Sequence, residues 1–346
     1  MRGIVLALGL ILSTVASALW ALDIEEERSF PALDGSGDSE LAILSTTDTV
    51  VFAPVIVAFQ TRNPSVTVRY TVASTTSVFG AIHNEGAAFD VVVSSAMDLQ
   101  MKLANDGLAQ GYRSDRTLAL PEWARWRDRL FGFAQEPVVT VLNRAAFAGV
   151  PLPRTRADLI RLMRDRPDML RGRIGTYDPN VSGAGYLFAT QDARQSDTYW
   201  RLSEVMGGLS PRLYATSSAM LSDLKEGRIV LAYNVLGSYA ATRPDPDESL
   251  LIVEPEDFTH ILLRTALIAR ASEQPELAAA FVDFLLSPEG QAVVDTETGL
   301  PAISAQHLRA GPHLRPIRLD PGLLVFVDPL MRQRFLSEWS SAVLQR

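Results

Sequence analysis

Three clusters of hydroxyl side chains lie in the first third of the sequence, and each cluster directly follows a short apolar run. They are Ser45, Thr46 and Thr47; Ser74, Thr75, Thr76 and Ser77; and Ser94 and Ser95. Hydroxyl groups donate and accept hydrogen bonds, so such clusters can hold a polar or anionic solute. Serine and threonine also commonly cap helices, and for any single cluster capping is the simpler interpretation.

The elements around these clusters determine which interpretation is favoured. Apolar runs at residues 41–44, 66–72 and 89–93 have the character of strands, and helical stretches are expected after each of them. This alternation predicts a parallel α/β sheet covered on both faces. Ligands bind outside the carboxyl ends of such strands, where helix N-termini add free N–H groups and a positive dipole end. Recurrence at three strand ends therefore supports a site for an anionic or highly polar small solute as strongly as it supports helix capping.

Catalytic and metal-binding alternatives find little support in the residue pattern. Ser182 lies in Asn-Val-Ser-Gly-Ala, which lacks the leading glycine of a nucleophile elbow, and no histidine near Asp178 completes a triad. The four histidines, His83, His260, His307 and His313, are not paired at metal-ligand spacing. We therefore expect no enzyme activity, no metal and no cofactor, with an exported hydrolase as the remote alternative.

Composition and charge narrow the class further. A chain of 346 residues with 47% hydrophobic residues has enough material for two domains. The absence of cysteine excludes disulfides, thiol catalysis and cysteine-ligated metal. A formal net charge of −8 argues against nucleic acid and anionic membranes as partners.

The N-terminal residues predict export. Arg2 precedes an apolar run at residues 4–15 and the small residues Ala16-Ser17-Ala18, which is typical of a secretory signal peptide cleaved near Ala18. The run is short for a membrane span, which takes roughly 20 residues, although a retained anchor is the alternative. We expect a periplasmic protein whose residues 19–40 form a leader or linker. At the other end, Met331, Phe335, Trp339 and Val343 lie on one stripe of a predicted helix, which indicates core packing rather than partner binding.

The order of several motifs resembles the type-2 periplasmic binding proteins that serve ABC transporters. The motifs are Phe89-Asp90-Val91-Val92-Val93, Glu136-Pro137-Val138-Val139, Arg171-Gly172-Arg173-Ile174-Gly175, Lys225-Glu226-Gly227-Arg228-Ile229, and Phe281 to Gln291 followed by Gly299-Leu300-Pro301. The resemblance implies a two-lobed α/β fold, each lobe a mostly parallel sheet flanked by helices, joined by a two-strand hinge. It implies residues 41–134 plus 258–346 as the first lobe and 135–257 as the second. Ser182, Gly183, Tyr233 and Asn234 are then expected to face the hydroxyl clusters from the second lobe.

The branch that this chain is most similar to is the ferric-iron-binding group, which also holds binders of phosphorylated sugars and phosphoglycerate-sensing regulatory proteins. Iron-binding members carry two adjacent tyrosines, whereas here Tyr233 is followed by Asn234 and the next tyrosine is Tyr239. The resemblance therefore implies a phosphorylated metabolite or an organic carboxylate as ligand, with ferric iron as the alternative. The implied partner is an ABC permease or a membrane sensor kinase, and the protein is expected to be monomeric.

Overall fold

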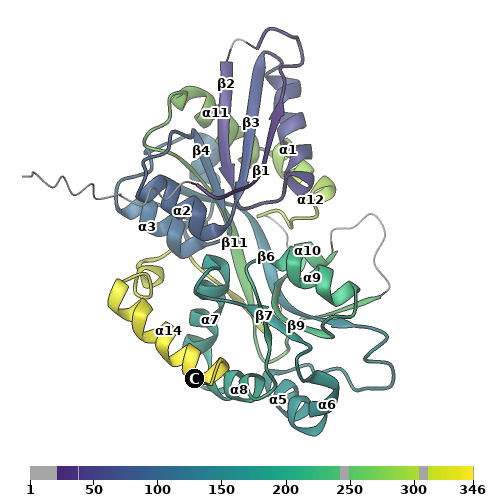
Figure 1. Cartoon of the computed structure of the whole chain (residues 1–346). Helices are drawn as coiled ribbons and strands as arrows, with labels where there is room; N and C mark the ends of the chain where they lie inside the picture. The colour runs from purple at the N-terminus through teal and green to yellow at the C-terminus, as the bar shows by residue number, and fades with distance from the viewer. Residues whose placement is uncertain (1–21, 38, 242–248, 304–310, 346) are drawn as a thin grey trace, which may run out of the picture.

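The computed structural model of the chain describes residues 22–37, 39–241, 249–303 and 311–345. Its strands form one continuous sheet in the order β1-β3-β2-β4-β11-β6-β9-β7-β8, and helices cover both faces of it. Figure 1 shows two lobes, one above the other, with β6 and β11 running between them. The expected two-lobed α/β architecture is confirmed.

The first lobe is built on three parallel strands, each followed by a helix. These elements are β2 (Ser39–Ser45), α1 (Thr49–Arg62), β3 (Val66–Ala73), α2 (Thr75–His83), β4 (Val91–Ser94) and α3 (Met97–Asn105). β2 pairs in parallel with both β3 and β4, so their carboxyl ends lie at the same edge of the sheet. All four residues of β4 are buried, which is typical of a strand that helices cover on both faces.

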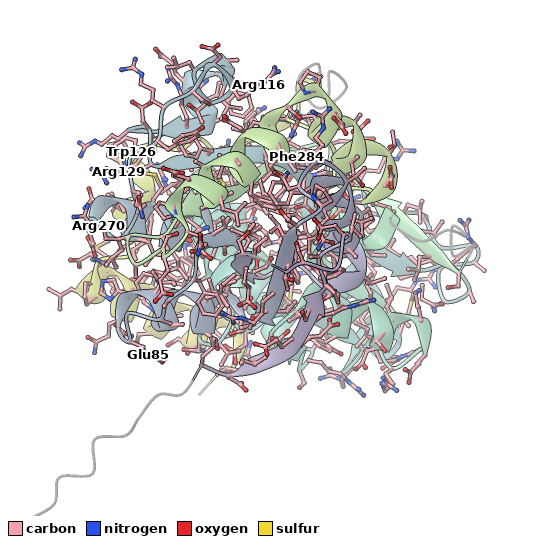
Figure 2. The ribbon with its side chains drawn as sticks, turned by 90° about the horizontal axis from the view of Figure 1, so that it is seen from above. Glu85, Arg116, Trp126, Arg129, Arg270 and Phe284 are labelled. Atoms are coloured by element: carbon pink, nitrogen blue, oxygen red, sulfur yellow. The ribbon has the colours of Figure 1, made fainter. Side chains whose placement is uncertain are left out.

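The rest of the first lobe covers this sheet. Its remaining elements are α4 (Asp115–Ala119), η1 (Glu122–Ala124), β5 (Arg125–Trp126), α11 (Pro275–Leu286) and α12 (Pro288–Glu297). Phe59 on α1 packs edge-on against Phe281 of α11, with ring centroids 5.1 Å apart, and also contacts Phe284. Seen from above in Figure 2, Phe284 lies in the interior of the lobe, whereas Glu85 and Arg116 lie at its rim.

The segment expected to be a leader contains a strand, which corrects that expectation. Residues Ile24–Phe30 form β1, which pairs antiparallel with β3 and closes one edge of the first-lobe sheet. Its acidic side chains are exposed, as is common on edge strands that avoid further pairing. The predicted signal peptide lies outside the described residues.

Two long antiparallel strands connect the lobes. The first part of β6 (Leu130–Asn143) pairs with β11 (Thr259–Ile268), and its second part pairs with β9 and β10. On these strands Arg264 Nε donates to Glu136 Oε1 at 2.8 Å, and both side chains are fully buried. This ion pair links the two strands in the interior of the sheet.

The second lobe repeats the arrangement of the first with shorter strands. Its elements are α5 (Arg156–Asp165), α6 (Pro167–Leu170), β7 (Ile174–Tyr177), α7 (Gly183–Gln195), α8 (Thr198–Gly207), β8 (Arg212–Tyr214), α9 (Ser217–Lys225), β9 (Leu231–Leu236), α10 (Gly237–Ala241) and β10 (Leu250–Val253). β7 pairs in parallel with β8 and β9, so the carboxyl ends of β7 and β8 share one edge.

The C-terminal segment contacts both lobes. It comprises β12 (Leu314–Pro316), η2 (Pro321–Leu324) and α14 (Pro329–Val343). η2 packs on α3 of the first lobe, whereas α14 packs on α8 of the second, with Phe335, Trp339 and Val343 buried there. The predicted core packing of this helix is confirmed. The helix packs against the second lobe, whereas residues 258–346 were expected to belong to the first lobe.

Among the described residues, no single helix is long and apolar enough to cross a membrane. The pair of α11 and α12 has the length and composition of a membrane span, but the two helices are bent by 65° relative to each other.

Candidate functional site

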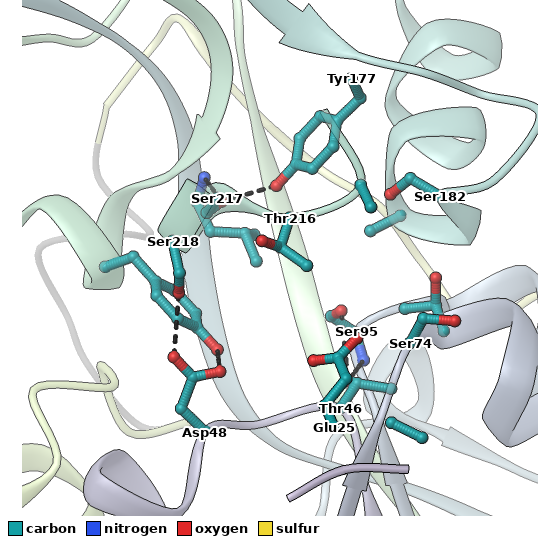
Figure 3. Close-up of a pocket in the computed structure, with 16 residues that line it drawn as sticks. Glu25, Thr46, Asp48, Ser74, Ser95, Tyr177, Ser182, Thr216, Ser217 and Ser218 are labelled. Atoms are coloured by element: carbon teal, nitrogen blue, oxygen red, sulfur yellow. Dashed lines mark hydrogen bonds between the residues drawn. The ribbon is translucent and has the colours of Figure 1, made fainter. Parts of the chain in front are cut away.

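A cleft lies where the carboxyl edges of the two lobes meet. Figure 3 shows its lining side chains, most of which end in hydroxyl groups. The lining residues are Glu25, Thr46, Asp48, Ala73, Ser74, Thr75, Ser95, Tyr177, Ser182, Ala184, Ala215, Thr216, Ser217, Ser218, Leu236 and Tyr239. They come mainly from strand ends and helix starts of both lobes, which is where open α/β sheets bind ligands.

The first-lobe wall uses the hydroxyl clusters that the sequence indicated. Thr46 Oγ1 accepts a hydrogen bond from the Ser95 N–H at 3.2 Å, so the ends of β2 and β4 are tied together. Ser74 Oγ accepts from the Ser77 N–H at 3.1 Å and caps α2. Among the described residues, Ser95 Oγ contacts only Thr46 Oγ1, at 3.5 Å, which leaves this hydroxyl available to a solute.

Two loops form the second-lobe wall: the loop at Ser182, which the sequence predicted, and the loop at residues 216–218, which it did not. Ser182 Oγ caps α7 by accepting from the Gly185 N–H at 3.1 Å. The missed residues are Thr216, Ser217 and Ser218, which follow β8 and begin α9. They form the same pattern of hydroxyls between a strand and a helix as in the first lobe. β8 has only three residues, too few for its apolar character to be recognised.

Four helix N-termini contribute positive potential to the cleft. Asp48, Ser74, Ser182 and Thr216 all line it, and they are the N-cap residues of α1, α2, α7 and α9. The positive dipole ends of these helices lie at the cleft, and some of their first-turn N–H groups are already bonded, such as that of Gly183 to Thr75 Oγ1. Among the described residues that line it there is no lysine, arginine or histidine. Any anion in this cleft would therefore be held by N–H groups and hydroxyls rather than by ion pairs.

Two carboxylates give the cleft a second chemical character. Asp48 Oδ2 accepts from Ser218 Oγ at 2.9 Å, and Tyr239 OH lies 3.5 Å from Asp48 Oδ1. Glu25 is exposed at the rim of the cleft on β1, and partial desolvation together with the nearby charge of Asp48 raises the pKa of Glu25. Carboxylates accept hydrogen bonds from solute hydroxyls, so this part of the cleft suits the polyol portion of a ligand.

The two lobes touch each other across the cleft. The Gly183 N–H donates to Thr75 Oγ1 at 2.7 Å, and Thr76 Oγ1 donates to the Val181 carbonyl at 2.9 Å. These contacts leave only about 50 Å³ in the cleft, compared with about 300–1,000 Å³ in typical small-molecule sites. A solute the size of a sugar phosphate must therefore enter through a more open arrangement.

Several of the predicted site residues have structural roles instead. Ser45 Oγ accepts from Tyr70 OH at 2.7 Å, Thr47 is buried and accepts from Arg264, and Ser94 Oγ accepts from the Ala96 N–H at 3.1 Å. Ser77 Oγ accepts from Ser74 Oγ at 2.9 Å. None of these four, nor Thr76 and Gly183 at the lobe contact, is among the described residues that line the cleft. In the folded chain, only one or two hydroxyls of each cluster face the cleft.

Tyr233 and Asn234 do not line this cleft. Tyr233 OH and Asn234 Nδ2 each donate to Asp192 Oδ2 at 2.8 Å, in a buried network that also holds Arg156. Asn234 has a φ of 62°, which lies in the left-handed region, at an irregularity in the pairing of β9 with β6. Burial would raise the pKa of Asp192, but the charge of Arg156 together with interactions of His260 and Asn234 outweighs burial and lowers that pKa. The network stabilises the second lobe.

The donor set of the cleft is a poor match for ferric iron. Tyr177 and Tyr239 both line it, but burial raises the pKa of Tyr177 well above its usual value and that of Tyr239 to about 12. Iron-binding tyrosines act as phenolates, so a raised pKa opposes metal binding. No group of three or more His, Cys, Asp or Glu side chains with metal-binding geometry occurs within the described residues.

The hinged two-lobe fold and a polar interlobe cleft define a solute-binding protein. The profile of the family described as bacterial extracellular solute-binding protein matches residues 45–299. The chain belongs to this family, whose members deliver solutes to ABC transporters. No curated protein sequence gives a match.

Three solved structures illustrate the similarity. The substrate-binding protein of an ABC transporter from Agrobacterium tumefaciens is 35% identical, with a TM-score of 0.88 over 92% of this chain and 98% of that one. The periplasmic binding protein AfuA from Actinobacillus pleuropneumoniae, with fructose-6-phosphate bound, is 17% identical, with a TM-score of 0.72 over 88% of this chain and 99% of that one. Iron-bound HitA from Pseudomonas aeruginosa is 19% identical, with a TM-score of 0.65 over the same shares of the two chains. At these identities the last two show the fold alone.

Proposed function

We propose that this protein captures a small hydroxyl-bearing anion, either a phosphorylated metabolite or an organic carboxylate, in the interlobe cleft and presents it to an ABC permease in the periplasm. The observation that carries the proposal is the convergence of four helix N-termini from both lobes on one hydroxyl-lined cleft. Helix N-termini combine N–H donors with a positive dipole end, which suits phosphate and carboxylate groups.

The two ends of the ligand would meet different groups. The anionic group would accept hydrogen bonds from Ser95, from Ser182 and from the first turns of α2 and α7, with each charge-assisted bond worth about 1.5–3 kcal/mol. Solute hydroxyls would donate to Asp48 and Glu25, which have no basic residue beside them among the described residues of the cleft. Together these groups favour a phosphorylated polyol over a plain dicarboxylate, because a dicarboxylate would bring a second anion near Asp48.

Capture requires the lobes to move. β6 and β11 would act as the hinge strands of the proposed lobes (residues 41–134 plus 258–346, and 135–257). The hydrogen bond from the Gly183 N–H to Thr75 Oγ1 would form when the lobes close. Closure of two lobes around a ligand is a hinge transition that a membrane partner can recognise. A sensor kinase is the alternative partner, and in neither case does the chain need a catalytic group.

Calorimetry of cleft variants tests the proposal. Thermal-shift screening with hexose phosphates, phosphoglycerate and dicarboxylates selects the ligand, and Ser95→Ala is then titrated with it. Loss of one hydrogen bond to an anionic ligand should weaken binding by roughly ten- to a hundredfold. Within the described residues, the only contact of Ser95 Oγ is the 3.5 Å one to Thr46 Oγ1, so the melting temperature should stay unchanged.

Thr296→Ala is the matched control, because Thr296 is an exposed hydroxyl on α12 that bonds its own helix. Unmutated affinity in Ser95→Ala and Ser182→Ala, at unchanged stability, would reject the cleft as the binding site.

A further inference from the structure

A second cavity, of about 380 Å³, lies at the opposite end of α7 from the cleft. Its volume falls within the range of about 300–1,000 Å³ that is typical of small-molecule sites. The lining residues are Gln191, Arg194, Gln195, His260, Arg315, Pro316, Ile317, Arg318, Asp320 and Leu323. We refer to it as the arginine cavity.

The charge of the arginine cavity is strongly positive, although the chain has a net charge of −8. Its three arginines face one carboxylate, Asp320, whose Oδ1 accepts from the Gly322 N–H at 2.7 Å. Arg315 Nη1 donates to the carbonyls of Pro312 and Leu314, at 2.8 and 3.0 Å. Within the described part of the chain, Arg194 and Arg318 have no carboxylate within ion-pair distance.

Some surface arginines of this protein each lie against a carboxylate. Arg69 lies 2.9 Å from Glu40, and Arg154 lies 2.6 Å from Glu256. Each of these two arginines has its own carboxylate, whereas the arginine cavity holds three arginines against a single carboxylate. Guanidinium groups that converge on a hollow without partners are suited to bind carboxylate or phosphate, because each presents a planar fork of donors.

Rigid elements hold the cavity. His260 on β11 and Arg315 on β12 are register partners across a parallel pair of strands. The His260 side chain is 5% exposed, and its Nε2 lies 3.3 Å from Asp192 Oδ1. Asp192 is held in turn by Arg156 at 2.8 Å. The floor of the cavity is therefore tied to the buried network of the second lobe, while Arg194 projects from the last turn of α7.

We propose that the arginine cavity is a second binding site, for a small multiply charged anion that carries two or more carboxylate or phosphate groups. Three guanidinium groups match such a polyanion better than a single charge, and the hollow is too small for a protein segment with a core of its own. A bound anion would tie α7 to the C-terminal segment of the chain. The proposal does not depend on the function proposed for the cleft.

Titration with pyrophosphate and with citrate, at constant ionic strength, tests the proposal. The double variant Arg194→Gln with Arg318→Gln should weaken binding of one or both probes at least tenfold, because each lost guanidinium removes charge-assisted hydrogen bonds. Both arginines are exposed, so the fold should survive, and an unchanged melting temperature without probe verifies it. Arg201→Gln, which removes a charge from an exposed site on α8, should change affinity by less than twofold.

The cleft is tested separately with Ser95→Ala and Ser182→Ala. If these cleft variants weaken pyrophosphate and citrate binding while the arginine variants do not, the anion binds in the cleft and the proposal is wrong. A loss in Arg201→Gln equal to that of the arginine variants would mean unspecific attraction, and it would also overturn the proposal. So would the absence of binding of both probes at a probe concentration of about 5 mM, at which a site with a Kd of about 1 mM would be mostly occupied.

Discussion

Replacing Gly183 with alanine should hinder closure of the lobes without weakening either lobe. A Cβ atom at this position would lie 2.7 Å from Leu99 Cδ1 and 2.9 Å from Thr75 Oγ1, both in the first lobe. Contacts this short force a displacement, and Leu99 has little room because it packs with Ala96 and Val327. The hydrogen bond from the Gly183 N–H to Thr75 Oγ1, 2.7 Å long, would be strained or lost as well.

The size of the effect follows from these two losses. Overpacking costs about 1–3 kcal/mol, and a lost neutral hydrogen bond about 0.5–1.5 kcal/mol. A penalty of about 2 kcal/mol on the closed state alone would weaken solute binding roughly thirtyfold, because only the closed population binds tightly. Gly183 is the first residue of α7 and its φ is not left-handed, so alanine fits the helix and the melting temperature should not fall.

Two measurements, calorimetry and a distance between the lobes, check this prediction. The chain has no cysteine, so Val57→Cys on α1 and Arg161→Cys on α5, both at exposed positions, give two unique sites for spin labels. Ligand should shorten the label distance in the otherwise unmutated protein and have a reduced effect in Gly183→Ala. Gly111→Ala is the matched control, since a Cβ there meets no described atom within 4 Å. If Gly183→Ala closes and binds like Gly111→Ala, the reasoning about the interlobe contact is wrong.

Three further predictions concern buried charge and metal. Burial raises the pKa of Asp98, on α3, to about 7, so the folded chain holds this proton more tightly than the unfolded chain and should lose stability as pH rises from about 4 to 7. Asp98→Asn should therefore raise the melting temperature at pH 8 and have no effect near pH 4, and an equal gain at both would contradict this. Glu136→Gln leaves Arg264 buried without its charged partner and should cost about 3–5 kcal/mol in urea denaturation. The exposed pair of Arg334 with Glu338 provides the control, because Glu338→Gln should cost less than about 1 kcal/mol, and equal losses in the two variants would refute the role of burial. Purified protein mixed with ferric citrate should stay colourless, and a coloured complex lost in Tyr177→Phe or Tyr239→Phe would show that iron is bound.

The hydroxyl clusters of the first lobe could be predicted because local sequence carries their signal. β2, β3 and β4 are apolar runs that end at Ser or Thr clusters, and parallel pairing brings those ends together. The sequence could not show which hydroxyl of a cluster faces the cleft. Tyr70, 25 residues further along the chain, donates a hydrogen bond to Ser45. Arg264, 217 residues further along, donates one to Thr47.

The remaining differences have the same origin in long-range contacts. β1 is a charged edge strand without apolar alternation, and only its pairing with β3 defines it, so Glu25 was not recognised as a cleft residue. Tyr233 and Asn234 belong to the expected strand and its end, but the left-handed conformation of Asn234 and the distant partner Asp192 direct both side chains into a buried network. Thr216 to Ser218 show the same pattern of hydroxyl residues between a strand and a helix, which is a local signal. The pattern could not be recognised because β8 has only three residues.

Mass spectrometry of the solute released from purified protein tests the central claim most directly. The protein is purified without added ligand from cells that express the full chain, then denatured, and the released small molecules are identified. We expect one stoichiometric compound that carries a phosphate or carboxylate group together with hydroxyl groups, and Ser95→Ala should release much less of it. A cationic or uncharged solute, or stoichiometric iron, would contradict the account of a cleft that binds anions through helix N-termini.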